Sequence, residues 1–192
     1  MSFIRAAYED ARSTLDRFFE SDANIALVEK AIQAFVVSFK NKGHVFSCGN
    51  GGSMCDSLHF AEELTGRYRK DRRPLPATGI SEAGHITCIA NDFGFEHIFS
   101  RYVEAWGGPN DALLAISTSG NSANVIKAVE AAKAHGMKVI GLLGKDGGSL
   151  KSMVDVPLII PSNVTDRIQE VHIKLIHIFI EGIERELFPE NY

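Results

Sequence analysis

The chain has 192 residues, 45% of them hydrophobic, and a formal net charge of -4 at pH 7. This length suits one domain with a substantial core, so we expect a single domain over residues 1–192. The acidic balance argues against nucleic acid as a partner, because nucleic-acid-binding surfaces are usually basic. We find no signal peptide and no apolar run of transmembrane length. The three cysteines form no CxxC pair, and these features together predict a cytoplasmic protein with no membrane partner.

The first 42 residues show helical spacing and no strand signal. Apolar residues between Ile25 and Phe39 recur every three or four positions, with Asp22 placed to cap a helix and Gly43 placed to end it. The segment carries no pattern that indicates chemistry. We therefore interpret residues 1–42 as a helical segment used in packing or assembly.

From residue 43 to residue 188, short apolar runs alternate with helical patterns. This alternation is typical of a parallel sheet covered by helices on both faces, so we predict an α/β fold for this core. The strand candidates are 45–48, 77–81, 86–90, 112–116, 139–143 and 156–160, and the helix candidates are 53–68, 95–106, 123–135 and 166–188. Ligands of such sheets bind beyond the carboxyl ends of the strands, so the turns after the strands are the expected place for a site.

The first of these turns reads CGNGGS and contains Asn50, Gly51, Gly52 and Ser53. Its glycines let the backbone approach a ligand closely, and Ser53 can open the next helix. A dinucleotide fingerprint would require glycine where Met54 stands, which weakens a nicotinamide-binding interpretation. A tight turn alone would need one glycine, but not all three together with Asn50.

The helix candidate that follows carries His59 and Glu63 four residues apart, on one face. An imidazole and a carboxylate at this spacing could share a metal ion or act as an acid/base pair. A solvated face with a Glu63–Arg67 ion pair explains the same spacing, and the spacing alone favours that simpler interpretation. The opposite side, which we expect to face the core, carries Met54, Leu58, Ala61 and Thr65.

Two later turns follow predicted strands. Asn91 and Asp92 come after the candidate at 86–90, where a helix cap with a turn glycine explains them locally. Residues 111–125 read DALLAISTSGNSANV, an apolar strand followed by a hydroxyl-rich turn and a helix start. Free N–H groups and partial positive charge at a helix N-terminus favour a phosphate group there. The turn has no lysine and no GxxxxGK[ST] pattern, which argues against a nucleoside triphosphate. Simple capping would use fewer than the four hydroxyls of Ser117, Thr118, Ser119 and Ser122.

The last helix candidate is apolar around more than half of its circumference. One sheet face cannot cover so wide an arc, so we expect another subunit to cover part of it. A lone histidine on a helix is most often structural, and His172 is interpreted in this way.

Six segments of the chain, taken in order, resemble one known family. They are CGNGGS (48–53), HFAEELTG (59–66), AND (90–92), ISTSGNS (116–122), DGG (146–148) and RIQEVHIKLIH (167–177). The sequence is similar to the sugar isomerase (SIS) domain proteins and, more narrowly, to the bacterial phosphoheptose isomerases. The resemblance runs from about residue 43 to the C-terminus and is specific only when the blocks are taken together.

The resemblance implies a flavodoxin-like three-layer αβα sandwich with a central, mainly parallel five-stranded sheet, assembled as a homotetramer. It also implies conversion of sedoheptulose 7-phosphate to D-glycero-D-manno-heptose 7-phosphate through an enediol, a step toward ADP-heptose and the lipopolysaccharide core. The alternative is a non-catalytic sugar-phosphate-binding regulator or adaptor on the same fold. A nicotinamide oxidoreductase is a more distant third.

Matched by position, the resemblance assigns the catalytic roles to Glu63 and His177. In zinc-containing relatives the matching metal ligands are His59, Glu63, Gln169 and His177, which implies one zinc ion per subunit. Met54 departs from the family pattern, which has alanine or a polar residue there. The substrate-binding residues that the resemblance implies are Asn50, Gly51, Gly52, Ser53, Glu63, Asn91, Asp92, Ser117, Thr118, Ser119, Ser122 and Gln169.

The spacing of Gln169 and His177 raises a geometric question about this zinc site. Eight residues span about 12 Å along a straight helix, whereas ligands lie only about 2 Å from a zinc ion. No glycine or proline between them would break the helix. We therefore expect an active site shared between subunits, in which His177, or otherwise Gln169, completes the site of a neighbouring protomer.

Overall fold

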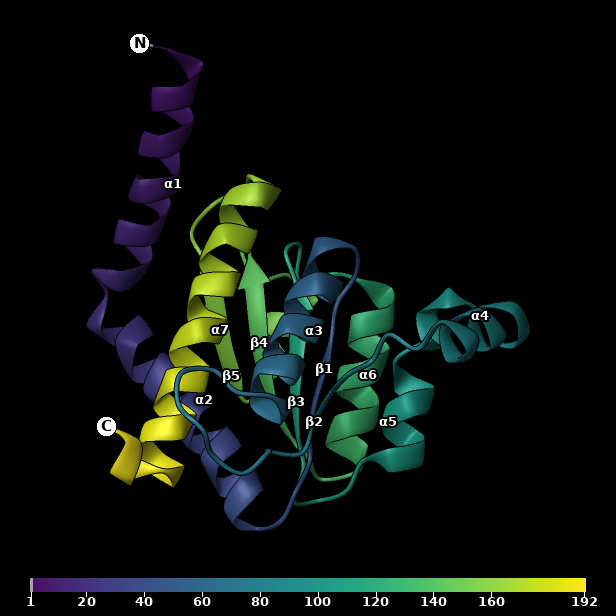
Figure 1. The fold of residues 1–192 in the computed structure, drawn as a ribbon. Helices are drawn as coiled ribbons and strands as arrows, with labels where there is room; N and C mark the ends of the chain where they lie inside the picture. The colour runs from purple at the N-terminus through teal and green to yellow at the C-terminus, as the bar shows by residue number, and fades with distance from the viewer. Residues whose placement is uncertain (1) are drawn as a thin grey trace.

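The computed structural model describes residues 2–192 and shows one parallel sheet between two layers of helices (Figure 1). The strands are β1 (Val45–Cys48), β2 (Ala77–Gly79), β3 (Ala112–Ser117), β4 (Lys138–Gly144) and β5 (Val156–Ile160). Their order is β2-β1-β3-β4-β5, and every neighbouring pair is parallel. The predicted α/β class with a five-stranded parallel sheet is therefore confirmed, and all five carboxyl ends lie at one edge of the sheet.

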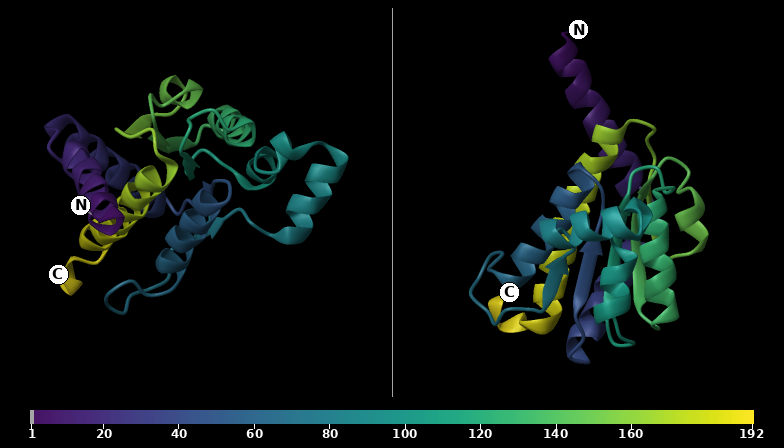
Figure 2. Two further views of the ribbon diagram at one scale, coloured as in Figure 1. Left: turned by 90° about the horizontal axis from the view of Figure 1, so that it is seen from above. Right: turned by 90° about the vertical axis from the view of Figure 1, so that its right-hand side faces the viewer.

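The two faces of the sheet carry separate cores because successive strand residues point to opposite sides. In β3, Leu114 and Ile116 enter one core, while Leu113 and Ala115 enter the other. The first core is covered by α1 (Phe3–Phe19), α2 (Asp22–Lys40), α3 (Gly52–Thr65) and α7 (Thr165–Leu187). The second is covered by α5 (Ser100–Trp106) and α6 (Ala123–Ala134), as the end-on view shows (Figure 2). Among residues 2–192, no helix is both long and apolar enough to cross a membrane.

The segment 86–90 is helical, so the strand predicted there is wrong. It lies inside α4 (Ala83–Asp92), whose start is capped by the Glu82 carboxylate, which accepts hydrogen bonds from the backbone of Gly84 and His85. A short apolar run fits a strand or a helix equally well, and the cap decides in favour of the helix. Only Ile89 of this helix is buried. α4 stands out from the body at one side (Figure 1), and the turn of Asn91 and Asp92 therefore ends a helix rather than a strand.

The broad apolar arc of α7 is covered within the chain, contrary to the prediction that a second subunit covers it. α7 packs against α1, α2 and α3 as well as against strands β4 and β5. Arg17 of α1 also donates a hydrogen bond to the carbonyl of Pro161, just before α7. The prediction counted only one sheet face, whereas the N-terminal helices fold back onto α7. The buried residues of α7 are Ile168, Val171, His172, Leu175, Ile176, Phe179, Ile180, Ile183 and Glu184.

α2 begins and ends close to the predicted positions, with one change of roles. Ser21 is the N-cap, and Asp22 is the first helical residue. At the other end Lys42, not Gly43, has the left-handed backbone conformation, with φ of 61°. Gly43 is needed for a different reason, since a Cβ there would lie 2.0 Å from the carbonyl oxygen of Asn110.

His172 is a structural residue of α7, as the sequence predicted. Its side chain is fully buried, and Nε2 donates a hydrogen bond to the carbonyl of Leu143 at 3.1 Å. Nδ1 has no partner among the described residues. Burial lowers the pKa of His172 from 6.5 to about 4, because the imidazolium would lose its hydration.

This shift makes stability depend on pH. Between pH 6.5 and pH 4 the unfolded chain binds a proton at His172 and the folded chain does not, so acid favours unfolding and stability rises with pH. His172→Gln, which can still donate to Leu143, should remove this dependence. We expect the unfolding free energy of the wild type, relative to that of His172→Gln, to fall by about 2–3 kcal/mol between pH 7 and pH 4.5. Denaturant titrations of both proteins at equal concentration measure it, and parallel pH curves would contradict it.

Candidate active site

The hydroxyl-rich turn after β3 forms a small cluster at the start of α6. Ser117 Oγ lies 2.9 Å from Ser122 Oγ and 3.5 Å from Ser119 Oγ. Ser122 is the N-cap of α6, yet its side chain makes no capping hydrogen bond to the helix backbone. The hydroxyls therefore gather at a helix N-terminus without serving as its caps, which is an arrangement suited to a phosphate group.

The loop after β4 holds this turn in shape. Gly120 has φ of +65°, and a Cβ on it would lie 2.0 Å from the carbonyl oxygen of Gly147. Asn121 Oδ1 accepts hydrogen bonds from both the backbone N–H and the hydroxyl of Ser149, each at 2.9 Å. The DGG segment at 146–148 thus supports the turn through close backbone packing.

Asn50 ties the turn after β1 to the start of α6. Its side-chain amide exchanges two hydrogen bonds of 2.8 Å with the amide of Asn124, which is buried. The resemblance implies a substrate-binding role for Asn50, whereas Asn124 was not among the predicted residues. Nothing in the sequence distinguishes a buried asparagine in a first helical turn from an exposed one. The structure gives the Asn50 side chain a role in joining the two loops.

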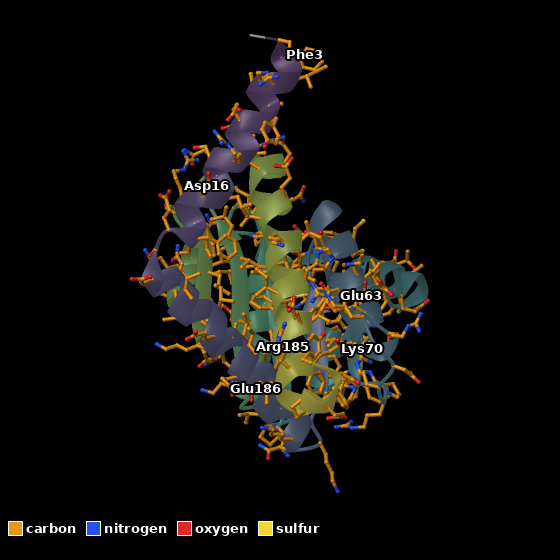
Figure 3. The ribbon with its side chains drawn as sticks, turned by 60° about the vertical axis from the view of Figure 1, so that its left-hand side comes forward. Phe3, Asp16, Glu63, Lys70, Arg185 and Glu186 are labelled. Carbon is orange, nitrogen blue, oxygen red and sulfur yellow. The ribbon has the colours of Figure 1, made fainter. Side chains whose placement is uncertain are left out.

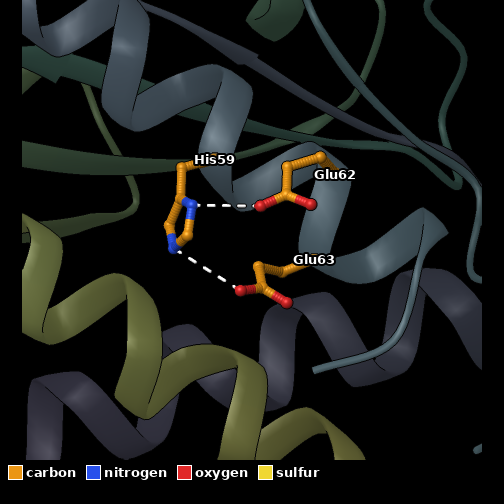
Figure 4. Close-up of side chains that lie close together, drawn as sticks. All are labelled: His59, Glu62 and Glu63. Carbon is orange, nitrogen blue, oxygen red and sulfur yellow. Dashed lines mark ion pairs between the residues drawn. The ribbon is translucent and has the colours of Figure 1, made fainter. Parts of the chain in front are cut away.

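A cluster of titratable side chains lies between α3 and α7. His59 Nε2 is 2.9 Å from His177 Nε2. It is also 3.7 Å from Glu63 Oε1, while His59 Nδ1 is 3.1 Å from Glu62 Oε1 (Figure 4). His59, Glu62 and Glu63 each offer a ligand atom, and these atoms lie within 4.8 Å of one another. His59 and Glu63 are partly buried, with side chains 34% and 18% exposed. Glu62 was not among the predicted site residues.

Partial burial shifts the protonation of this cluster. Burial raises the pKa of Glu63, the neighbouring Glu62 raises it further, and His59 opposes the shift. Burial lowers the pKa of His177, and the nearby His59 and Lys174 lower it further. Burial also raises the pKa of Asp56, one turn before His59, to about 6. Glu63 is therefore a stronger base than an exposed glutamate, while His177 favours its neutral form.

The buried face of α3 differs in part from the predicted one. The sequence placed Leu58 and Thr65 toward the core, but Leu58 is 41% exposed and Thr65 is exposed as well. Leu58 was placed there because of its hydrophobicity alone. The core face of α3 instead includes two serines, of which Ser57 donates a hydrogen bond to Ser47 of β1. The buried residues of α3 are Ser53, Ser57, Phe60, Ala61 and Leu64.

The four predicted zinc ligands fall into two places within one chain. His59, Glu63 and His177 come together, whereas Gln169 lies against the start of α3, where a Cβ on Gly52 would be 2.6 Å from Gln169 Nε2. Gly52 precedes His59 by two helical turns, about 10 Å. α7 is unbroken between Gln169 and His177, as predicted. His177 nevertheless contacts His59 of its own chain, so bringing these two together requires no second subunit.

Asn91 and Asp92 lie apart from these clusters. Both are exposed at the end of α4, where Asn91 Nδ2 donates to Asp92 Oδ1 at 2.7 Å. Gly51 is exposed as well, and its φ of +56° is a backbone conformation that glycine adopts readily at the turn after β1. Thr118 is half-buried in the hydroxyl-rich turn. The roles assigned to these residues remain predictions.

The class of protein follows from the sheet order, the hydroxyl-rich turn after β3 and the cluster of titratable side chains between α3 and α7. The family model of the SIS domain matches residues 8–144. The sequence is 54% identical over 187 residues to phosphoheptose isomerase of Fusobacterium nucleatum, covering 97% of this chain and 96% of that protein. It is 57% identical over 185 residues to phosphoheptose isomerase of Escherichia fergusonii, covering 96% of each. The chain belongs to the phosphoheptose isomerase family of SIS domain proteins.

Solved structures of the same name agree with this assignment. Phosphoheptose isomerase from Neisseria gonorrhoeae superposes with a TM-score of 0.89 at 39% identity, covering 94% of this chain and 96% of that one. Phosphoheptose isomerase from Francisella tularensis superposes with a TM-score of 0.90 at 34% identity, covering 95% and 96%. The Vibrio vulnificus NanR protein, solved with ManNAc-6P, shares the fold at a TM-score of 0.72 and 16% identity. That likeness concerns the fold alone.

Proposed function

We propose that this protein is an isomerase that converts sedoheptulose 7-phosphate into D-glycero-D-manno-heptose 7-phosphate. The product would feed the formation of ADP-heptose for the lipopolysaccharide core, and we place the enzyme in the cytoplasm. The observation that carries the proposal is the convergence of Glu63 and His177 on His59 in a chain of the phosphoheptose isomerase family. A sugar-phosphate sensor would need the phosphate site but no such pair of titratable groups.

The proposed reaction moves a proton between two adjacent carbon atoms of the sugar. Glu63 takes the proton from the carbon beside the carbonyl, giving an enediol, and returns it to the neighbouring carbon. Its raised pKa suits this role, because a base works best when its pKa approaches the working pH. His177, kept neutral by its lowered pKa, can pass a proton between the two oxygen atoms of the enediol.

An isotope experiment tests the reaction. The protein is incubated with sedoheptulose 7-phosphate in D₂O, and the aldose phosphate is followed by NMR. We expect the aldose to appear with deuterium at C2 when the abstracted proton exchanges with solvent. Failure to form any aldose phosphate would refute the proposed function. Fructose 6-phosphate, a ketose phosphate one carbon shorter, serves as the comparison substrate.

We propose that the turn from Ser117 to Ser122 binds the phosphate group. Thr118→Ala and Ser119→Ala should each raise KM about tenfold, the effect of one lost hydrogen bond to a charged group, with little change in kcat. Steady-state kinetics measure both constants. Ser152→Ala, which removes an exposed hydroxyl outside the turn, is the control. Unchanged KM in both variants would place the phosphate elsewhere.

The cluster between α3 and α7 also suits one zinc ion per subunit. Imidazole nitrogen and carboxylate oxygen are common zinc ligands, and His59 Nε2 lies 3.7 Å from Glu63 Oε1 and 2.9 Å from His177 Nε2. A bound zinc ion would polarise the substrate carbonyl. Gln169 lies near Gly52 rather than in this cluster, so we assign it first to substrate binding. Metal analysis of the purified protein tests this assignment.

We further propose a homotetramer in which neighbouring subunits share the active sites. Several large apolar side chains are exposed in the isolated chain, Phe3, Phe95 and Trp106 among them. Asn91 and Asp92 stand on α4, away from the α3–α7 cluster, so they can line a site only if another copy brings them there (Figure 1). Sedimentation analysis tests the tetramer.

Mixed oligomers test whether a neighbouring subunit contributes His177 or Asp92 to the active site. Because Glu63 and His177 both contact His59 of one chain, hybrids of Glu63→Gln with His177→Gln subunits should recover no activity. Hybrids of Glu63→Gln with Asp92→Asn should recover a substantial fraction if Asp92 comes from a neighbour. Co-expression with two affinity tags gives verified hybrids for the assay. Recovery in the first pair would show instead that His177 acts across the interface.

A further inference from the structure

Arg72 lies on the segment between α3 and β2, and its side chain is only 1% exposed. Glu63 near the end of α3 and Lys70 on this segment both lie on the same side of α7 (Figure 3). The ion-pair partner of Arg72 is Glu184 on α7, whose side chain is 2% exposed. Arg72 Nε lies 2.9 Å from Glu184 Oε1. A buried ion pair of this kind needs every remaining donor and acceptor to be satisfied.

The guanidinium satisfies that requirement at the end of α3. Nη2 donates to the backbone carbonyl of Glu63 at 2.7 Å, and Nη1 donates to those of Leu64 and Gly66 at 2.9 and 2.7 Å. The last turn of α3 carries no basic residue of its own. Arg72 therefore supplies both the hydrogen bonds and the positive charge that complete a helix C-terminus.

The second carboxylate oxygen of Glu184 is held by the end of the chain. Tyr192 donates its hydroxyl to Glu184 Oε2 at 2.8 Å, and the Arg185 guanidinium lies 4.4 Å from the centre of the Tyr192 ring. Asn191 adds a hydrogen bond from its side chain to the carbonyl of Asp71, next to Arg72. The last residues thus fold back onto the ion pair.

We propose that Arg72, Glu184 and Tyr192 form a clamp that positions Glu63 against His177, a role that rests on the proposed isomerisation. Arg72 binds the backbone of Glu63 itself. Glu184 lies on the same helix as His177, two turns further along. One guanidinium therefore connects the two helices that carry the two groups. A displacement of about 1 Å between reacting groups can cost on the order of 10²-fold in rate, so the clamp acts on kcat through geometry, as a set of positioning residues.

Arg72→Lys tests the clamp because lysine keeps the charge but cannot reach three carbonyls and a carboxylate at once. We expect kcat to fall by about 10²-fold while KM stays within about twofold, since the hydroxyl-rich turn lies on another loop. Tyr192→Phe removes one hydrogen bond and should lower kcat roughly threefold. Arg17→Lys is the matched control, because Arg17 also donates to a backbone carbonyl between segments, away from α3. It should leave kcat unchanged.

Each outcome decides the proposal. A normal kcat in folded Arg72→Lys, or a KM that rises as steeply as kcat falls, would reduce the clamp to a purely stabilising contact. If Arg72→Lys does not fold, Glu184→Gln and Tyr192→Phe replace it, and a normal kcat in either folded variant overturns the proposal. Wild-type protein that does not isomerise sedoheptulose 7-phosphate would refute the proposed function instead. In that case the clamp is tested by the ring NMR signals of His59 and His177 in metal-free protein. These signals should shift in Arg72→Lys but not in Arg17→Lys, and unshifted signals in Arg72→Lys would overturn the clamp.

Discussion

Replacing Glu63 with glutamine should lower kcat by roughly 10³-fold, because general acid–base catalysis of this kind contributes about 10²–10⁴-fold. Glutamine keeps the size of the side chain and a hydrogen-bonding oxygen but cannot accept the proton. KM should stay within about twofold, since the proposed phosphate contacts lie on the turn after β3. Steady-state kinetics on sedoheptulose 7-phosphate, with product followed directly, measure both constants.

The neighbouring carboxylate offers the matched control. Glu62 lies 3.1 Å from His59, closer than Glu63 at 3.7 Å, but its side chain is 64% exposed. The Glu62 carboxylate points into solvent, whereas that of Glu63 is partly buried between α3 and α7. Glu62→Gln should therefore retain most of the turnover. If Glu62→Gln were inactive and Glu63→Gln active, the two roles would have to be exchanged.

Gly120→Ala should disable the hydroxyl-rich turn and destabilise the protein by about 2–6 kcal/mol. The methyl group would collide with the carbonyl oxygen of Gly147, 2.0 Å away, and alanine would be held at a φ of +65°. A strained backbone of this kind costs about 1–3 kcal/mol, and overpacking adds about as much. We expect KM to rise by more than the tenfold assigned to a single hydroxyl. Urea unfolding and steady-state kinetics measure the two effects.

A substitution at Gly136, at the other end of α6, separates the cost of backbone strain from the cost of steric overlap. It has φ of +73°, but the nearest atom to an added Cβ is 3.5 Å away on Pro109. Gly136→Ala therefore carries the backbone strain alone and should cost about 1–2 kcal/mol with KM unchanged. Equal stability losses in the two variants would show that the loop after β4 yields easily and does not hold the turn.

Two parts of the candidate site could be predicted from the sequence, because each depends on residues that are close together in the chain. The apolar run before Ser117 and the helical spacing after Ser122 place a helix N-terminus beside several hydroxyls. His59 and Glu63 share a face whatever the helix packs against, since four residues make about one turn. The convergence of Glu63 and His177 on His59 depends on how α3 and α7 lie together, because His177 follows Glu63 by 114 positions. No local spacing contains that information, and it entered the prediction only through resemblance.

The sequence by itself determined the α/β class and placed a strand candidate on each of the five strands, together with a sixth at 86–90. It also located the turns at the carboxyl ends, because these features follow from periodicity and turn chemistry within a few residues. It could not determine that 86–90 is helical, since a short apolar run has no period of its own and only the Glu82 cap decides it. Nor could it show that the N-terminal helices cover α7. Tertiary structure alone decided the Asn50–Asn124 pair and the place of Arg72 between Glu63 and Glu184. Such buried polar contacts join residues far apart in the chain, and packing rather than local preference brings them together.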